Sequence, residues 1–197
     1  MAKLKLTKNE QKKQKDSLKM FQRYLPTLML KKQQLQAEIR TVDIRVKKLR
    51  AEKDALTGGF KKWIAVFGEE AFTPDILRIA RIVTGEGNIA GVAIPLFEGV
   101  DFETAQYDLA QKPLWLDFAV ENMKKVLLVD LETRTLEEQQ KRLQKELRTT
   151  SQRVNLFEKI KIPEAKTNIK KISVYLGDQQ TAAVVRGKIS KRGMEKA

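Results

Sequence analysis

The chain has 197 residues, a formal net charge of +14, 32% charged side chains, and neither cysteine nor histidine. It therefore has no disulfide and no thiolate metal site, and it lacks the commonest general base and the commonest zinc ligand. No apolar run approaches the roughly 20 residues that span a bilayer, and no apolar signal core follows the charged N-terminus. We expect a soluble protein of the cytosolic side, without a cofactor or a metal.

Heptad spacing runs from Leu18 to Leu56. Ten of the twelve a and d positions are apolar, whereas Lys, Gln, Arg, Glu and Asp fill most positions between them. A 3,4-spaced seam of this length indicates a coiled-coil helix about 60 Å long, which needs a partner helix to bury its seam. The apolar seam residues are Leu18, Phe21, Leu25, Leu28, Leu35, Ile39, Val42, Val46, Leu49 and Leu56.

The ends of this helix are less sharply marked than its seam. Residues 1–13 are polar and Lys-rich, which suits either a frayed tail or a helix start that orders on a partner. Pro26 either kinks the helix or begins it, and we favour a kink because the heptad phase continues across it. Thr57-Gly58-Gly59 predicts the C-terminal end, since glycine accepts the left-handed cap conformation.

Residues 58–113 differ in kind from the flanking segments. The 60–83 stretch begins with an apolar cluster, after which Thr73-Pro74-Asp75 predicts a short helix running to about Val83. Apolar and β-branched runs at 89–97 and 100–107 flank Glu98-Gly99 and predict a β-hairpin turning there. Pro95 restricts its strand to an edge or a bulge.

A second helical stretch begins at Trp115, with a weaker seam. Its main apolar positions are Leu143, Leu147, Val154, Phe157, Ile169, Ile172 and Leu176. The phase slips between Phe157 and Ile162, which predicts a change of winding there, next to Pro163. The basic residues after Arg186 predict a mobile tail.

These elements predict a mainly α fold, in which N- and C-terminal helices form a long antiparallel two-helix coiled coil. The segments are 1–57, a helix with a basic tail; 58–113, a cap at the turn with a short helix and a β-hairpin; and 114–197, a helix with a basic tail. We expect residues 153–162 to lie opposite part of 26–57. The segments carry net charges of +10, −3 and +7, so the two basic flanks are expected to meet an acidic partner.

Motifs for catalysis are missing from the sequence. Gly85-Glu86-Gly87 lacks the later glycine and the Lys-Ser/Thr of a nucleotide-binding loop. Adjacent carboxylates such as Glu137-Glu138 point about 100° apart on a helix, which suits a solvated surface better than an acid–base pair. We therefore expect a non-catalytic chain.

Several segments resemble the D subunit of the V-type (archaeal and bacterial A/V-type) ATPases, over nearly the whole length. The most specific is Ser151-Gln152-Arg153-Val154-Asn155-Leu156-Phe157-Glu158, followed by Ile162-Pro163 and the amphipathic run to Leu176. Lys188-Ile189-Ser190-Lys191, Leu6-Thr7-Lys8-Asn9, the 28–35 segment and the 88–95 segment also resemble the family. The small size and Leu25-Pro26-Thr27-Leu28 suggest a bacterial, chlamydia-like version.

The resemblance implies the central-stalk rotor shaft of a rotary ATPase that moves protons or sodium ions. The shaft would turn inside a head of catalytic and regulatory subunits, meet the small F subunit of the central stalk and a membrane-side coupling subunit, and remain cytoplasmic and peripheral to the membrane. No nucleic acid or direct membrane insertion is implied. Expected partner contacts are Ile89, Val92, Ile94, Phe97, Phe102, Arg153, Lys188, Lys191 and Arg192.

Three other functions fit parts of the sequence. A basic coiled coil that binds nucleic acid agrees with the net charge, although the middle segment is acidic and no recognition motif is present. A hairpin chaperone or tether would form an oligomer with itself. A peripheral membrane helix is disfavoured because the seam is narrow and suits another helix better than lipid.

Overall fold

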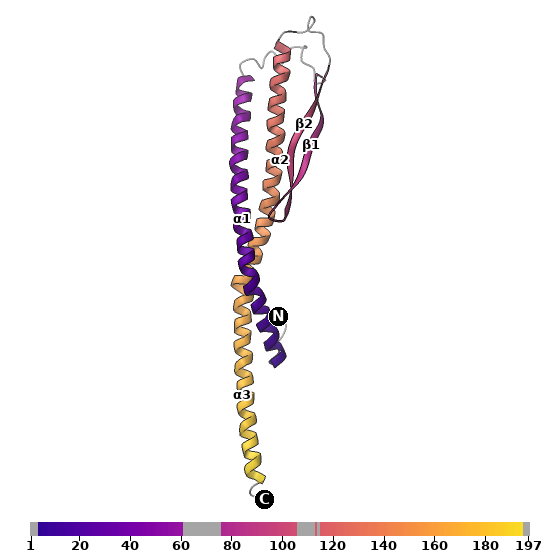
Figure 1. The fold of residues 1–197 in the computed structure, drawn as a ribbon. Helices are drawn as coiled ribbons and strands as arrows, with labels where there is room; N and C mark the ends of the chain where they lie inside the picture. Colours follow the sequence, from indigo (N-terminus) through magenta and orange to yellow (C-terminus); the bar gives the residue numbers. More distant parts are fainter. Residues whose placement is uncertain (1–3, 61–75, 106–112, 114, 195–197) are drawn as a thin grey trace. The chain divides into compact units, whose positions relative to one another are not determined.

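A computed structural model describes residues 4–60, 76–105, 113 and 115–194. Its elements are α1 (Lys8–Phe60), β1 (Leu77–Ile89), β2 (Val92–Thr104), α2 (Trp115–Asn155), the π-helix η2 (Leu156–Lys161) and α3 (Ile162–Met194). The predicted mainly α fold, with long N- and C-terminal helices and a small β-hairpin between them, is confirmed (Figure 1).

The chain divides into two compact units, and α1 and α2 each pass through both. Unit 1 comprises Met1–Lys32 and Thr149–Ala197, and unit 2 comprises Gln33–Arg148. Unit 1 therefore contains the first turns of α1 together with η2 and α3. Unit 2 contains the rest of α1, the hairpin and most of α2.

The start of α1 follows a capping pattern in the sequence. Thr7 Oγ1 accepts a hydrogen bond from the backbone N–H of Glu10 at 3.3 Å, and Glu10 places a carboxylate in the first turn. Both features suit the unpaired N–H groups of a helix start. Pro26 lies inside α1, so the helix does not begin there, and the helix continues through Gly58 and Gly59 to Phe60 rather than ending at Thr57.

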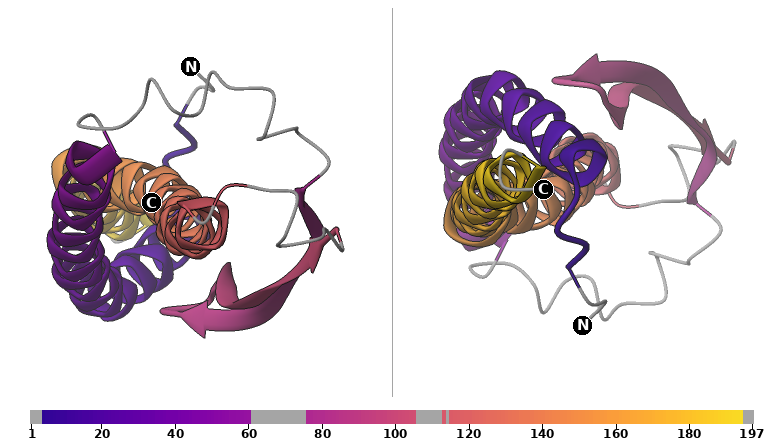
Figure 2. Two further views of the ribbon diagram at one scale, coloured as in Figure 1. Left: turned by 90° about the horizontal axis from the view of Figure 1, so that it is seen from above. Right: turned by 90° about the horizontal axis from the view of Figure 1, so that it is seen from below.

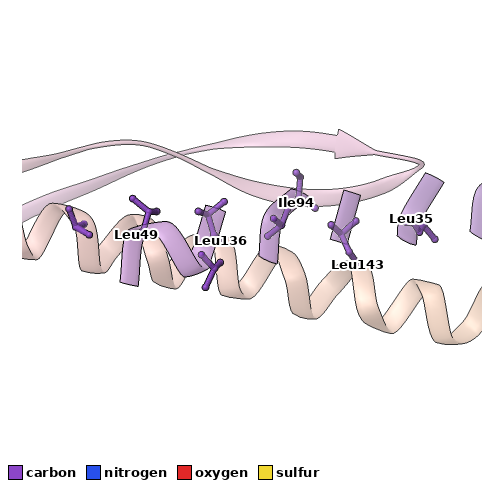
Figure 3. Packing of buried hydrophobic residues seen from close by; sticks show 8 residues of the cluster. Leu35, Leu49, Ile94, Leu136 and Leu143 are labelled. Carbon is purple, nitrogen blue, oxygen red and sulfur yellow. The ribbon is translucent and has the colours of Figure 1, made fainter. Parts of the chain in front are cut away.

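The larger of the two buried clusters in the described part of unit 2 is shared by α1, α2 and β2 (Figure 3). Leu35 and Leu143 have no exposed surface, and Ile94 of β2 is only 3% exposed. Figure 2 shows the hairpin on one side of the paired helices, so that the third element is added to one flank of the pair. The cluster comprises Leu35, Val42, Val46, Leu49, Ile94, Val129, Leu136 and Leu143.

The hairpin differs in register from its prediction. β1 and β2 pair antiparallel from Leu77↔Thr104 to Ile89↔Val92, so the turn lies at Ala90-Gly91 and not at Glu98-Gly99. Both turn residues have positive φ, 51° and 79°, and Asn88 Oδ1 accepts the Gly91 N–H at 2.9 Å. Such a two-residue turn matches the twist of paired strands.

The short helix predicted up to Val83 is wrong over its described part, since residues 77–83 belong to β1. The register shift between Ile79 and Arg81 interrupts the alternation of side chains in this strand, whereas the shift between Val83 and Thr84 adds its extra residue, Glu98, to β2. The predicted helix start at 73–75 and the apolar cluster at 61–67 lie outside the described residues.

In unit 1 the predicted phase slip coincides with η2. The Ile162 N–H donates to the Phe157 carbonyl, five residues back, so one extra residue enters the turn. Pro163 follows directly and has no N–H to give to an α-helical ladder. The helix then continues to Met194, so the segment after Arg186 is helical in the structure, where a mobile tail was expected.

Candidate functional site: the helix seam, the hairpin and the basic surface

Every residue predicted for the helix seam is buried or partly buried. The rings of Phe21 and Phe157 lie 5.1 Å apart at 42°, which fixes the register of the pair in unit 1. This contact places Phe157 beside Phe21, just before the 26–57 segment, part of which was expected opposite residues 153–162. Leu35, Val42, Val46, Leu49, Leu143, Val154 and Ile172 are buried; Leu18, Phe21, Leu25, Leu28, Ile39, Leu56, Leu147, Phe157, Ile169 and Leu176 are partly buried.

Ion pairs among the described residues flank the seam of unit 2, and in three of them the cation lies on α1 and the anion on α2. Arg45 bonds Glu132, Arg50 bonds Glu137 and Lys53 bonds Asp130, each at 2.6 Å. Exposed pairs of this kind stabilise by at most about 1 kcal/mol each. Their main effect is on specificity, because two copies of α1 paired with each other would place like charges together.

Asp43 adds a polar link beside these pairs. Lys47 bonds its carboxylate at 2.7 Å within α1, and Gln140 of α2 donates to it at 3.3 Å. The hydrogen bond from Lys47 lowers the pKa of Asp43, with smaller help from Gln140 and Arg50. The ionised carboxylate of Asp43 therefore stabilises the folded chain fully at neutral pH. This stabilisation is lost as the pH falls through the lowered pKa of Asp43.

Two side chains of α2 hold the hairpin by its backbone. The buried Gln139 donates to the carbonyl oxygen of Pro95, and Arg142 donates to that of Ala93 at 3.4 Å. The tip also packs against the core through Ile89, Ala90 and Val92. A hairpin alone is marginal in water, so α2 supplies both the apolar contact and the hydrogen bonds that keep it in place.

The residues predicted to contact partners fall into two groups. Ile94 is in the core of the chain itself, and Ile89, Val92, Phe97 and Phe102 are partly buried. Arg153, Lys188, Lys191 and Arg192 are exposed. The hairpin also exposes three large apolar side chains that are not among these named residues, although they lie within the 60–83 and 89–107 stretches that were expected to meet partners: Ile79, Ile82 and Leu96. Ile79 and Ile82 flank the register shift between Ile79 and Arg81, which interrupts the alternation of side chains at that point of β1.

The sequence reasoning also missed Gln139, Arg142 and the ion pairs. The pairs had a usable signal, because Arg45 and Arg50 flank the heptad seam and Lys53 occupies a seam position. Gln139 and Arg142 had none, since their acceptors are backbone carbonyls of a distant strand.

Charge separates the two units sharply. Unit 1 has 21 basic and 6 acidic residues, a net charge of +15, whereas unit 2 has 18 basic and 19 acidic residues, a net charge of −1. Among the described residues there is no group of three or more side chains able to hold a metal ion. Nor does any helix in the described ranges combine the length and the apolarity needed to cross a membrane.

These features define a class of protein: a two-helix coiled coil that carries a β-hairpin on one flank and a strongly basic unit. The family model for the ATP synthase D subunit matches residues 10–192. The chain is 50% identical over 196 residues to the V-type ATP synthase D subunit of Borreliella burgdorferi, covering 100% of this chain and 97% of the relative.

Two chlamydial proteins with the same name are also similar. That of Chlamydia trachomatis is 34% identical and that of Chlamydia muridarum 32% identical, each match covering 98% of this chain and 96% of the relative. The chain therefore belongs to the family of ATP synthase D subunits. The resemblance found in the sequence is thereby confirmed, and with it the expectation of a non-catalytic subunit of a rotary ATPase.

Proposed function

We propose that this chain is the central-stalk rotor subunit of a V-type ATPase or ATP synthase. It transmits rotation between the catalytic head, which hydrolyses or makes ATP, and the ion-translocating ring in the membrane. The observation that carries the proposal is the one-sided construction of unit 2. Because the hairpin is bonded to one flank of the helix pair, the faces of the shaft differ from one another. A rotor needs such asymmetry, so that each catalytic interface meets a different face of the shaft at any one time.

Stiffness is the second requirement of an axle. The buried seam and the three ion pairs join α1 to α2 at several levels, so twisting one helix against the other must break contacts along the pair. Close-packed interiors resist such deformation. The paired parts of the two long helices therefore turn as one body in this proposal.

The proposed partners follow the charge and the exposed side chains. The basic unit, with Arg153, Lys188, Lys191 and Arg192, meets the catalytic and regulatory subunits of the head. The outer side of the hairpin, with Ile79, Ile82 and Leu96, meets the small F subunit of the stalk or the membrane-side coupling subunit. The chain works on the cytoplasmic side, peripheral to the membrane, without inserting into it and without binding nucleic acid.

Rotation of a label tests the proposal directly. The chain has no cysteine, so Glu121→Cys, an exposed position near the start of α2, places a single thiol for a bead on it. In a cysteine-free head assembly fixed by its catalytic subunits, we expect ATP to drive rotation of the bead in one direction. A bead on a catalytic subunit is the control and remains still. ATP hydrolysis with an immobile bead on the Glu121→Cys variant would refute the rotor role.

A further inference from the structure

The outer edge of β2 is covered by α2. Gln139 donates to the carbonyl oxygen of Pro95, and Arg142 donates to that of Ala93. Both carbonyls therefore point away from β1, and so does the nitrogen of Pro95, which has no hydrogen to leave unpaired. A covering helix and a proline are two of the devices that keep the edge of a sheet from pairing with another chain.

The edge of β1 has neither device over residues 84–88. The register pairs Glu86 with Pro95 and Asn88 with Ala93. Partners in an antiparallel ladder either bond each other or both point outward, so Glu86 and Asn88 direct their backbone groups away from β2, and alternation adds Thr84. No described residue bonds these outward groups, and β1 contains no proline. Three residues of one edge therefore offer unpaired N–H and C=O groups to another chain.

One face of the hairpin carries apolar side chains that the core of the chain does not use. Ile79 pairs with Phe102 and Ile82 pairs with Val100, and the register places these four on one face of the hairpin together with Phe97. Neither buried cluster of the described residues includes or contacts any of the five. Ile79 and Ile82, on the strand with the uncovered edge, remain 41% and 43% exposed. A strand added beside β1 would extend this apolar face and shield both side chains.

Charge indicates what kind of strand fits this edge. Glu86 has its backbone on the edge, and the carboxylate of Glu98 lies over Gly85, in the place that a Cβ would take. Neither carboxylate forms an ion pair with a described residue, and residues 82–89 contain no basic side chain. A second copy of β1 would therefore bring carboxylates together, whereas a segment with lysine or arginine complements them.

We propose that the edge of β1 at residues 84–88 is a docking site for an extended segment of another protein, which joins the hairpin as a third strand. The segment places a basic side chain near Glu86 and apolar side chains beside Ile82. In this mode of binding, backbone hydrogen bonds supply affinity and alternate side chains supply specificity. The partner's identity as a subunit of the same rotary assembly rests on the proposed function, whereas the uncovered edge follows from the hairpin itself.

Hydrogen exchange of the full chain, alone and in the assembled complex, tests the proposal. In the chain alone, the outward amides of Thr84, Glu86 and Asn88 should exchange about tenfold faster than the amides of Gly85 and Gly87, which are bonded to β2. In the complex, we expect the three outward amides to slow about tenfold or more, while those of the two glycines change much less. Outward amides that exchange equally fast in both states would overturn the proposal.

A proline variant separates an added strand from other kinds of cover. Glu86→Pro removes only an outward N–H, as Pro95 does on the opposite strand, so the bonds between β1 and β2 persist. In the complex this variant should lose most of the protection of Thr84 and Asn88, whereas the matched control Glu86→Gln, which keeps the N–H, should retain it. Slow exchange of the two glycines in the chain alone verifies that the hairpin is intact; if it is not, Thr84→Pro makes the same change at another outward position. An intact proline variant that remains protected contradicts the proposal.

Protein concentration tests for a second copy as the occupant. In the chain alone, exchange of the three outward amides should not depend on concentration. If their protection grows with concentration and sedimentation shows a dimer, the occupant is a second copy and the proposed partner is wrong. Unprotected amides in an assembly whose bead rotates would refute the added strand alone, whereas protected amides in an assembly with an immobile bead would refute the rotor role alone.

Discussion

Leu143 has no exposed surface and lies in the cluster that joins α1, α2 and β2. Truncation at this position removes most of an isobutyl group from close packing and leaves a cavity between three elements. We predict that Leu143→Ala lowers the free energy of unfolding by about 2–5 kcal/mol, measured by urea denaturation followed by far-ultraviolet circular dichroism.

Leu30→Ala is the matched control for that truncation. Leu30 is also a leucine in a long helix, but 57% of its surface is exposed. Its truncation should change the free energy of unfolding by no more than about 0.5 kcal/mol. Similar losses for both variants would mean that the cluster does not determine stability.

At the scale of single residues, the backbone of Ala90 explains why the sequence predicted the turn of the hairpin at the wrong place. Ala90 adopts a φ of 51°, a conformation that alanine seldom takes and that Asn or Gly usually signals in a sequence. Glu98-Gly99 resembles a turn but lies within β2, where Gly99 pairs with Val83. Packing of Ile89, Val92 and Ile94 on the core decides the register, and this contact with distant helices is invisible in a local pattern.

At the scale of elements, the helices were predictable because a long seam repeats its signal many times. The slip between Phe157 and Ile162 was predictable for the same reason, since a step of five residues breaks an otherwise regular series of threes and fours. β1 was not predictable, because the register shift between Ile79 and Arg81 interrupts the alternation in its first half, and Gly85 and Gly87 in its regular second half are residues that usually signal a break. The hairpin's existence could be inferred from composition, but its position could not.

The π-helix η2 gives an element-scale prediction. Deleting Glu158, an exposed residue of η2, restores unbroken heptad spacing, and Pro163→Ala restores the missing backbone donor. We expect the doubly changed chain to form one continuous α-helix and to have a free energy of unfolding within about 1 kcal/mol of the wild type or above it, measured by thermal denaturation.

A deletion outside η2 shows whether the heptad phase accounts for the stability expected of the doubly changed chain. Removing Gln152, also exposed, turns the buried Val154 away from the seam without touching η2. This variant should lose about 2 kcal/mol or more of stability. If both deletions are equally harmful, the extra residue of η2 does not serve the phase of the seam.

At the scale of the whole molecule, the end of α3 contributes charge and not packing. Between Gly177 and Arg192 every side chain is exposed except the partly buried Ala182. We predict that removing residues 186–197 changes the free energy of unfolding by less than about 0.5 kcal/mol, yet lowers the number of ions moved per ATP in the assembled complex. Proton or sodium flux measured together with ATP hydrolysis in vesicles gives this ratio.

A full-length variant shows whether coupling depends on the basic charges at the end of α3 or on the length of the helix. Changing Lys188, Lys191 and Arg192 together to Gln keeps the helix but removes three charges. If the basic character matters, this variant should couple as poorly as the shortened chain. An unchanged ratio of ions to ATP in both variants would show that the basic end has no role in coupling.

The ion pairs between α1 and α2, with their cations on the first helix, have a consequence during synthesis. Arg45 and Arg50 leave the ribosome 87 residues before their partners Glu132 and Glu137. At about 5–20 residues per second, α1 waits roughly 4–17 s for α2 with its apolar seam uncovered. During that interval, the basic side chains of nascent α1 helices on neighbouring ribosomes repel one another. The side chains that later select α2 therefore also keep unfinished chains apart.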